Sequence, residues 1–167
     1  MSDPTRIDIS FDPRERRMRG VAIHGNTPFD VPFISHIAEN LWVGGCQNGL
    51  VLPSDIKHVV SMYPWEKYAL HDDADRFEFT AYDGVNDSMG IFHTAALKTI
   101  GLLKDGPTLV HCQAGLNRSS TVAALVLFGL GRKMRDAIDL LREKRSPAVL
   151  CNREFEDWLL DVDLSEG

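Results

Sequence analysis

One stretch of the chain, residues 108–120, constrains the fold more than any other. It opens with a short apolar run from Thr108 to Val110, whose length and β-branched side chains predict a buried strand. A loop that contains Gly115 follows, and the apolar density of residues 119–130 predicts a buried helix. A strand, a tight loop and a helix N-terminus in this order point several backbone N–H groups at one spot. The stretch therefore predicts a binding site for a dianion such as phosphate.

Two side chains in this stretch suit chemistry on phosphate. Cys112 follows the predicted strand at the base of the site, where positive potential would hold its thiol as a thiolate. Arg118 lies at the rim, and its planar guanidinium can bind two phosphate oxygens at once. A cysteine and an arginine at this spacing also occur together by chance, as a core cysteine beside a surface arginine. Here His111, Gly115 and Ser119 accompany the pair between a predicted strand and a predicted helix, which favours the functional interpretation.

The pattern His-Cys-x-x-Gly-x-x-Arg-Ser, residues 111–119, resembles the signature of the cysteine-dependent protein tyrosine phosphatases, in particular their small dual-specificity group. The resemblance extends over about residues 37–160, although only the signature is specific. It implies hydrolysis of phosphotyrosine, with phosphoserine and phosphothreonine as further candidates, through a phosphocysteine on Cys112. Arg118 would bind the phosphoryl group, and the Ser119 hydroxyl would help the thiolate leave in the second step. Backbone N–H groups of the intervening loop would bind the phosphoryl oxygens, namely those of Gln113, Ala114, Gly115, Leu116 and Asn117.

A proton donor for the leaving oxygen is expected on a neighbouring loop. Asp83 and Asp87 both lie in the polar, turn-rich loop after a strand predicted over residues 77–82. Members of the family carry the acid directly after this strand, so the resemblance favours Asp83, with Asp87 as the alternative. His111 is expected to position the loop through hydrogen bonds rather than to transfer protons.

An aromatic loop, residues 63–68, follows another predicted strand at residues 59–63. The carboxyl ends of the strands face the ligand crevice in open α/β sheets, so Trp65 could flank the phenyl ring of a substrate. Equally, the aromatic side chains of this loop could fold back onto the core. The sequence leaves both interpretations open.

The charge balance bears on the choice of substrate. The chain of 167 residues has a formal net charge of −6 at pH 7, which makes it a poor candidate for binding nucleic acid. Residues 115–119 also resemble the Gly-x-Asn-Arg-hydroxyl run of the cysteine-type RNA 5′-triphosphatases, which is the alternative function. Those enzymes are basic around the pocket and need no comparable aspartate, so the acidic balance and the presence of Asp83 count against it.

Two further functions are disfavoured by the signature itself. Lipid-specific relatives place lysines inside the loop, where this chain has Gln113, Leu116 and Asn117. A phosphate-binding module without catalysis would be expected to lack Cys112 or Arg118, and both are present.

Cysteine usage and hydropathy indicate a cytoplasmic protein. Three cysteines in a chain of this length do not make a disulfide framework, and a thiolate nucleophile needs a reducing compartment. No apolar stretch reaches transmembrane length and the N-terminus has no signal-peptide pattern, so no membrane association is expected. Histidine spacing predicts no metal site, no cofactor is expected, and the expected partner is a phosphorylated protein substrate. Cys46 and Cys151 are expected to be buried as small apolar residues, with a reversible disulfide between Cys46 and Cys112 as the alternative.

The predicted elements indicate a single α/β domain with a central, mostly parallel sheet flanked by helices on both faces. We assign residues 36–167 to this phosphatase domain and residues 1–35 to an N-terminal arm. The predicted strands cover residues 40–45, 59–63, 77–82 and 108–110, and the predicted helices cover residues 92–104, 119–130, 134–145 and the segment after Asn152. In the arm, residues 6–11 and 21–23 could form short strands, and Pro28 and Pro32 are expected to break any regular element.

Overall fold

The computed structural model describes most of the chain, and the described strands form two separate sheets. The described residues are 7–9, 19–24, 27–32, 34–45, 52–62, 74–80, 89–112 and 115–166. Within these ranges, no helix has the length and apolar character needed to cross a membrane.

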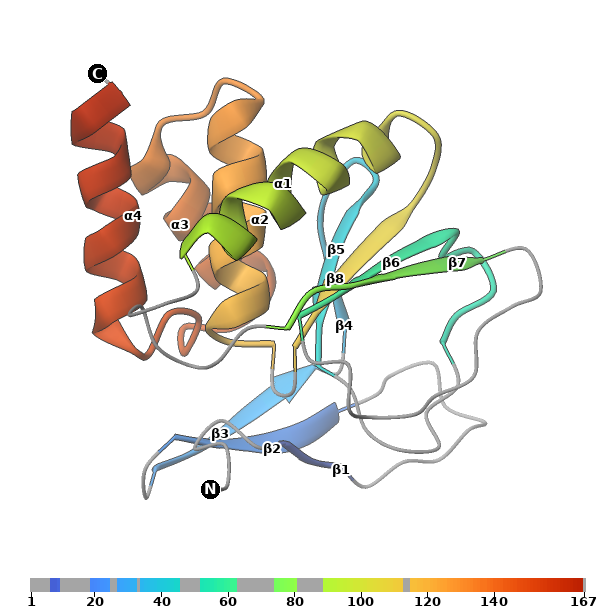
Figure 1. Cartoon of the computed structure of the whole chain (residues 1–167). Helices are drawn as coiled ribbons and strands as arrows, with labels where there is room; N and C mark the ends of the chain where they lie inside the picture. The colour runs from blue at the N-terminus through green and yellow to red at the C-terminus, as the bar shows by residue number, and fades with distance from the viewer. Residues whose placement is uncertain are drawn as a thin grey trace.

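The larger sheet places the signature strand at its centre (Figure 1). Its described strands are β4 (Ile34–Ala38), β5 (Leu41–Gly44), β6 (His58–Ser61), β7 (Asp75–Glu78) and β8 (Thr108–His111). They lie in the order β4-β5-β8-β6-β7, and every neighbouring pair is parallel except β4 with β5. All residues of β8 are buried, as expected for a strand with parallel neighbours on both sides.

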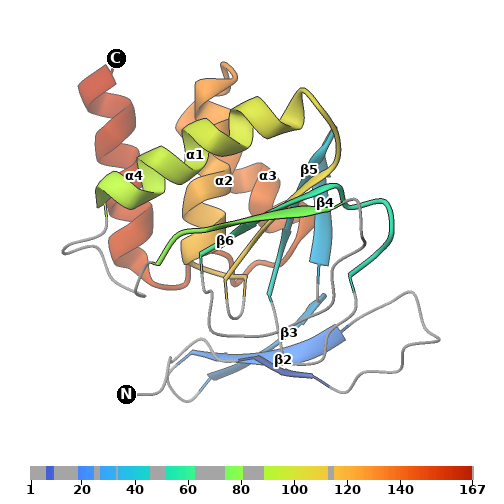
Figure 2. The ribbon, with the colours of Figure 1, turned by 45° about the vertical axis from the view of Figure 1, so that its right-hand side comes forward.

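The helices of the described residues gather beside this sheet in both views (Figures 1 and 2). They are α1 (Met89–Leu103), α2 (Arg118–Gly129), α3 (Met134–Lys144) and α4 (Arg153–Glu166). The core between helices and sheet includes Val60 and Val110 from the strands and Phe92 and Phe155 from the helices. The rings of Phe92 and Phe155 meet edge to face with their centroids 5.5 Å apart, so α1 and α4 pack on each other as well.

The sheet is buried on its second face too. Val59 and Leu109 alternate with Val60 and Val110 along their strands, so they point away from the helices, and both have no exposed surface. The helices and the mostly parallel sheet confirm the α/β class that the sequence predicts.

The parallel register aligns four strand ends at one edge of the larger sheet. Gly44, His111, Ser61 and Glu78 are paired across the sheet as the last residues of β5, β8, β6 and β7. The chain therefore leaves all four strands at the same edge, which is where open α/β sheets bind their ligands.

The smaller sheet is an antiparallel arrangement of the N-terminal strands. It consists of β1 (Ile7–Ile9), β2 (Arg19–His24) and β3 (Thr27–Pro32), in that order. The expectation that Pro28 and Pro32 break any regular element is wrong, because both lie within β3. Among the described strands, β3 lies at the edge and pairs only with β2, and an edge strand tolerates the missing N–H of a proline. In both views this sheet lies beyond the carboxyl edge of the larger sheet (Figures 1 and 2).

Candidate active site

The signature stretch forms the strand, loop and helix that its sequence predicts. β8 ends at His111, Cys112 follows, and α2 begins at Arg118. The Cys112 N–H donates to the Gly44 carbonyl at 3.3 Å, which fixes the start of the loop against the end of β5. Cys112, Arg118 and Ser119 are each at most 2% exposed. The fold thus buries these three predicted residues together, between the end of β8 and the first turn of α2.

Two hydrogen-bond donors lie within reach of the Cys112 sulfur. The Ser119 Oγ, in the first turn of α2, is 3.3 Å from Sγ. The Gly115 N–H donates to Sγ at 3.2 Å from the loop. Two donors directed at one sulfur stabilise it as an anion, which is the nucleophilic form.

His111 is neutral in the folded protein at ordinary pH. Burial lowers its pKa to about 3, and a hydrogen bond to the Cys112 carbonyl opposes that shift. The ring Nδ1–H donates to this carbonyl at 3.2 Å. These contacts fit a residue that orients the chain around Cys112.

Gly115 occupies a place in the loop that leaves no room for a side chain. Its φ of +74° lies in the left-handed region, and a Cβ there would lie 2.5 Å from the Gly44 carbonyl carbon. The glycine therefore allows the loop to pass directly against the backbone of β5.

A buried arginine that the sequence analysis missed lies behind this glycine. Arg145 follows α3, is 4% exposed, and donates from Nε to the Gly115 carbonyl at 2.7 Å. In the sequence, an arginine at a helix end before Ser146 and Pro147 suggests only a cation that complements the helix dipole. No spacing rule connects it with a glycine 30 residues earlier in the chain.

The rest of the described loop is fastened to the segment between α3 and α4. The Leu150 N–H donates to the Leu116 carbonyl at 2.8 Å, and the Asn152 N–H donates to Asn117 Oδ1 at 3.0 Å. The Asn117 carbonyl accepts from both the N–H and the hydroxyl of Thr121, at 2.8 and 2.7 Å, which starts α2. Leu116 and Asn117 are buried, at 0% and 1% exposure.

Several predicted site residues lie outside the described part of the chain. These are Cys46, Trp65, Asp83, Asp87, Gln113 and Ala114. The strand β6 precedes Trp65 in the chain and ends beside β8, and β7 precedes the two aspartates and ends beside β6 at the same carboxyl edge. The roles of these residues stay predictions.

The remaining candidate groups do not form a second reactive centre within the described residues. There, no three His, Cys, Asp or Glu side chains gather closely enough to hold a metal ion. Cys151 is half-buried, and its Sγ lies 3.7 Å from the amide nitrogen of Asn117.

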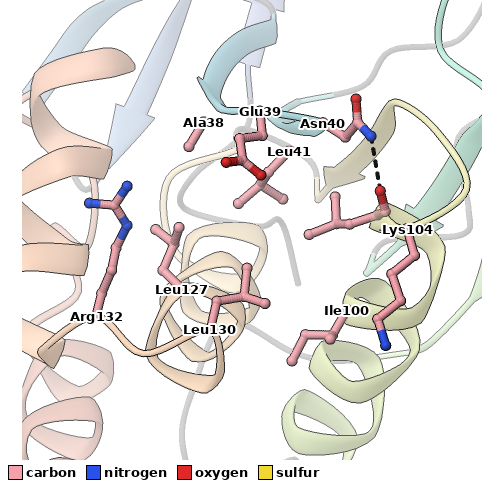
Figure 3. Close-up of a pocket in the computed structure, with 10 residues that line it drawn as sticks. Ala38, Glu39, Asn40, Leu41, Ile100, Lys104, Leu127, Leu130 and Arg132 are labelled. Carbon is pink, nitrogen blue, oxygen red and sulfur yellow. Dashed lines mark hydrogen bonds between the residues drawn. The ribbon is translucent and has the colours of Figure 1, made fainter.

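A hollow of about 440 Å³ lies between α1 and α2, at the amino end of β5 (Figure 3). Leu41 and Leu127 provide apolar walls, while Asn40, Lys104 and Arg132 provide polar groups. None of the residues predicted to act on phosphate lines it. It is separate from the site around Cys112.

Comparison with known proteins shows what the chain is similar to. The family model described as the dual specificity phosphatase catalytic domain matches residues 56–164. The putative tyrosine phosphatase 123R of Invertebrate iridescent virus 6 is 31% identical, with 74% of this chain and 92% of that protein covered. The MAP kinase phosphatase with leucine-rich repeats protein 3 of Dictyostelium discoideum is 41% identical over 36% of this chain, and the match spans 7% of that protein.

A solved structure shares the fold. The mouse putative dual specificity phosphatase complexed with zinc tungstate superposes with a TM-score of 0.67 at 16% sequence identity, covering 80% of this chain and 87% of that one. The family match spans more than half of the chain and contains the whole signature stretch with Cys112 and Arg118. The resemblance that the sequence suggests is thereby confirmed, and the chain belongs to the dual specificity phosphatase catalytic-domain family.

Proposed function

We propose that this chain hydrolyses phosphotyrosine in protein substrates through a phosphocysteine on Cys112, with phosphoserine and phosphothreonine as further substrates. The observation that carries the proposal is the buried Cys112 sulfur, which has Ser119 and Gly115 as donors and lies just before the N-terminus of α2. Family membership supports phosphoester chemistry, and the viral relative is itself named as a putative tyrosine phosphatase.

In the first step, the Cys112 thiolate attacks phosphorus. A sulfur–phosphorus bond forms while the bond between phosphorus and the tyrosine oxygen breaks. Asp83 gives its carboxyl proton to the leaving oxygen, so a neutral phenol departs. The Arg118 guanidinium and the N–H groups of the loop stabilise the charge on the non-bridging oxygens.

In the second step, water attacks the phosphocysteine. The water proton passes to the Asp83 carboxylate, the new oxygen–phosphorus bond forms, and the sulfur–phosphorus bond breaks. Its electron pair returns to the Cys112 sulfur, where the Ser119 hydroxyl 3.3 Å away stabilises the thiolate. Orthophosphate leaves and the nucleophile is regenerated.

A panel of phosphopeptides assayed with matched variants tests this proposal. Hydrolysis of phosphotyrosine peptides should disappear in Cys112→Ser. Asp83→Asn should lower the turnover of phosphotyrosine roughly 10²- to 10⁴-fold and that of para-nitrophenyl phosphate much less, because para-nitrophenolate leaves without a proton. Asp87→Asn is the matched control, and a larger loss in that variant would assign the acid to Asp87 instead.

Triphosphate-ended RNA, assayed with the same variants beside the phosphopeptides, tests the alternative function. The family match gives no support to an RNA 5′-triphosphatase. Release of phosphate from triphosphate-ended RNA, with no hydrolysis of any phosphopeptide and no loss in Asp83→Asn, would overturn the proposal.

A further inference from the structure

The phosphate-binding loop needs its backbone N–H groups to face the anion before the substrate arrives. Among the described residues of the loop, Gly115 has the widest range of backbone conformations, because glycine can adopt both positive and negative φ. A loop that depends on this residue therefore needs contacts from outside to hold its peptide planes.

Arg145 supplies such contacts from behind the loop. Its Nε donates to the Gly115 carbonyl at 2.7 Å, while its Nη1 donates to Ser35 Oγ at 3.1 Å and to the Val43 carbonyl at 3.3 Å. Ser35 lies on β4 and Val43 on β5, so one planar guanidinium joins the loop to two strands of the sheet. The Nη2 atom lies so close to Gly115 that a Cβ there would be 2.5 Å from it.

The geometry of the peptide group converts this contact into an orientation of the loop. In a trans peptide the C=O and N–H bonds point in opposite directions, and none of the described peptide bonds is cis. A Gly115 carbonyl that points at Arg145 therefore turns the Leu116 N–H away from the buried guanidinium. The bond from the Leu150 N–H to the Leu116 carbonyl turns the Asn117 N–H away from Leu150 in the same manner.

We propose that Arg145 is a positioning residue of the phosphate-binding loop. The planar fork of N–H donors on its guanidinium fixes the Gly115 carbonyl and thereby orients the Leu116 N–H toward the anion. The inference rests on the proposed function, because it concerns the loop of that same site. Arg145 touches no substrate in this account, and it acts only through the peptide between Gly115 and Leu116.

The competing explanation is that the site needs only the positive charge of Arg145 and not its planar set of N–H donors. Burial lowers the pKa of Arg145 to about 10, and the charge of the Cys112 thiolate opposes that shift, so Arg145 is cationic at neutral pH. A lysine at this position would keep the charge and the apolar stem, but its single ammonium cannot reproduce the planar set of donors. Arg145→Lys therefore separates the fork from the charge, and Arg145→Met removes both.

The test measures binding of the oxyanion tungstate as well as turnover. For each variant, we would record the rise in melting temperature with tungstate, the inhibition of para-nitrophenyl phosphate hydrolysis by tungstate, and kcat and KM. Arg145→Lys and Arg145→Met should each weaken tungstate binding and lower kcat/KM by at least about tenfold, the size of a lost hydrogen bond from a charged group. If Arg145→Met does not fold, Arg145→Lys carries the test, since it preserves the charge and most of the buried volume.

Two control variants separate positioning from stability. Arg135→Met removes an arginine within α3, whose partner is Glu156 on α4, and it should leave tungstate binding unchanged. Leu159→Ala opens a cavity under α4, away from the loop, and it should lower the melting temperature without weakening tungstate binding at a temperature where the variant is folded.

Three results would overturn the inference. The first is a wild-type affinity for tungstate in Arg145→Met, and the second is a wild-type affinity in Arg145→Lys. The third is a loss of tungstate affinity in Leu159→Ala as large as that in the Arg145 variants, when each variant is measured the same number of degrees below its own melting temperature. A wild-type protein that binds tungstate but hydrolyses no phosphoester would refute the proposed function instead. The thermal measurements on the Arg145 variants would still decide the role of Arg145.

Discussion

The hydroxyl of Ser119 lies 3.3 Å from the sulfur of Cys112, with both residues buried. They are seven positions apart in the chain, and the turn from β8 into α2 brings them together. A thiolate cannot donate a hydrogen bond, so Ser119 is the donor when the sulfur is ionised. In the proposed second step, this hydrogen bond would stabilise the thiolate as it leaves.

Ser119→Ala should slow the release of phosphate from Cys112 more than the formation of the phosphocysteine. The loss of a hydrogen bond to a charged atom is worth about 1.5–3 kcal/mol, which corresponds to a decrease in kcat of about 10- to 100-fold. Rapid mixing with para-nitrophenyl phosphate should then show a burst of para-nitrophenolate followed by slow turnover. A decrease in kcat without a burst would place the effect in the first step and contradict this role.

Gly115→Ala should abolish most of the activity. The new Cβ would lie 2.5 Å from the Gly44 carbonyl carbon and from Arg145 Nη2, and the φ of +74° disfavours any side chain. The matched control is Gly131→Ala, since Gly131 has a φ of +106° but open space around its missing Cβ. Backbone strain should lower the free energy of unfolding of both variants by about 1–2 kcal/mol, as measured by urea unfolding. Only Gly115→Ala should also have a lower kcat/KM. Equal activity in the two variants would show that the close approach does not matter.

The stability of the fold should decline in mild acid because of His111. Its pKa is about 3 in the folded protein and about 6.5 in an unfolded chain, so the unfolded state binds the extra proton between these values. The contribution is fully present above pH 6.5, and as the pH falls below that value the free energy of unfolding should drop by about 1.4 kcal/mol per unit. Urea unfolding between pH 5 and 7, where most carboxylates stay ionised, measures this slope. His111→Asn, which cannot titrate, should flatten it, and an unchanged slope in that variant would assign the effect to another group.

Glu156→Gln should loosen the packing of α4 on α3. Glu156 accepts two hydrogen bonds from Arg142, at 3.1 and 2.9 Å, and one from Arg135 at 3.1 Å. The hydrogen bond from Arg142 is the main reason that the pKa of Glu156 is lowered, so its contribution to stability is present above about pH 4.5 and is lost in stronger acid. The variant should lose about 1 kcal/mol at pH 7 and differ little from the wild type near pH 3. Glu154→Gln on the exposed first turn of α4 is the control, and it should stay within about 0.5 kcal/mol of the wild type.

The signature unit could be predicted from the sequence because its signals are local. The apolar run at residues 108–110 became β8, and the apolar segment at residues 119–130 became α2, each within one residue of the expected bounds. The last helix is predicted after Asn152, and the Asn152 Oδ1 accepts from the Glu154 N–H at 3.2 Å, as an N-cap does. In each case the pattern and the contact lie within a few residues of each other.

Features that depend on distant partners could not be predicted in the same way. The alternation of Phe77 and Phe79 indicates a strand, but β7 covers Asp75–Glu78 because it pairs with β6, which ends at Ser61. β3 contains two prolines because it needs a partner on one side only. Arg145 donates hydrogen bonds to residues 30, 102 and 110 positions away, and no sequence pattern near Arg145 predicts those acceptors.

The central place of β8 makes the position of Cys112 depend on the integrity of the whole larger sheet. β8 is hydrogen-bonded to β5 on one side and to β6 on the other, so it cannot fray alone as an edge strand can. Heating should therefore not displace Cys112 by local unfolding while the rest of the protein stays native. Inactivation and the cooperative loss of the sheet should follow one and the same curve.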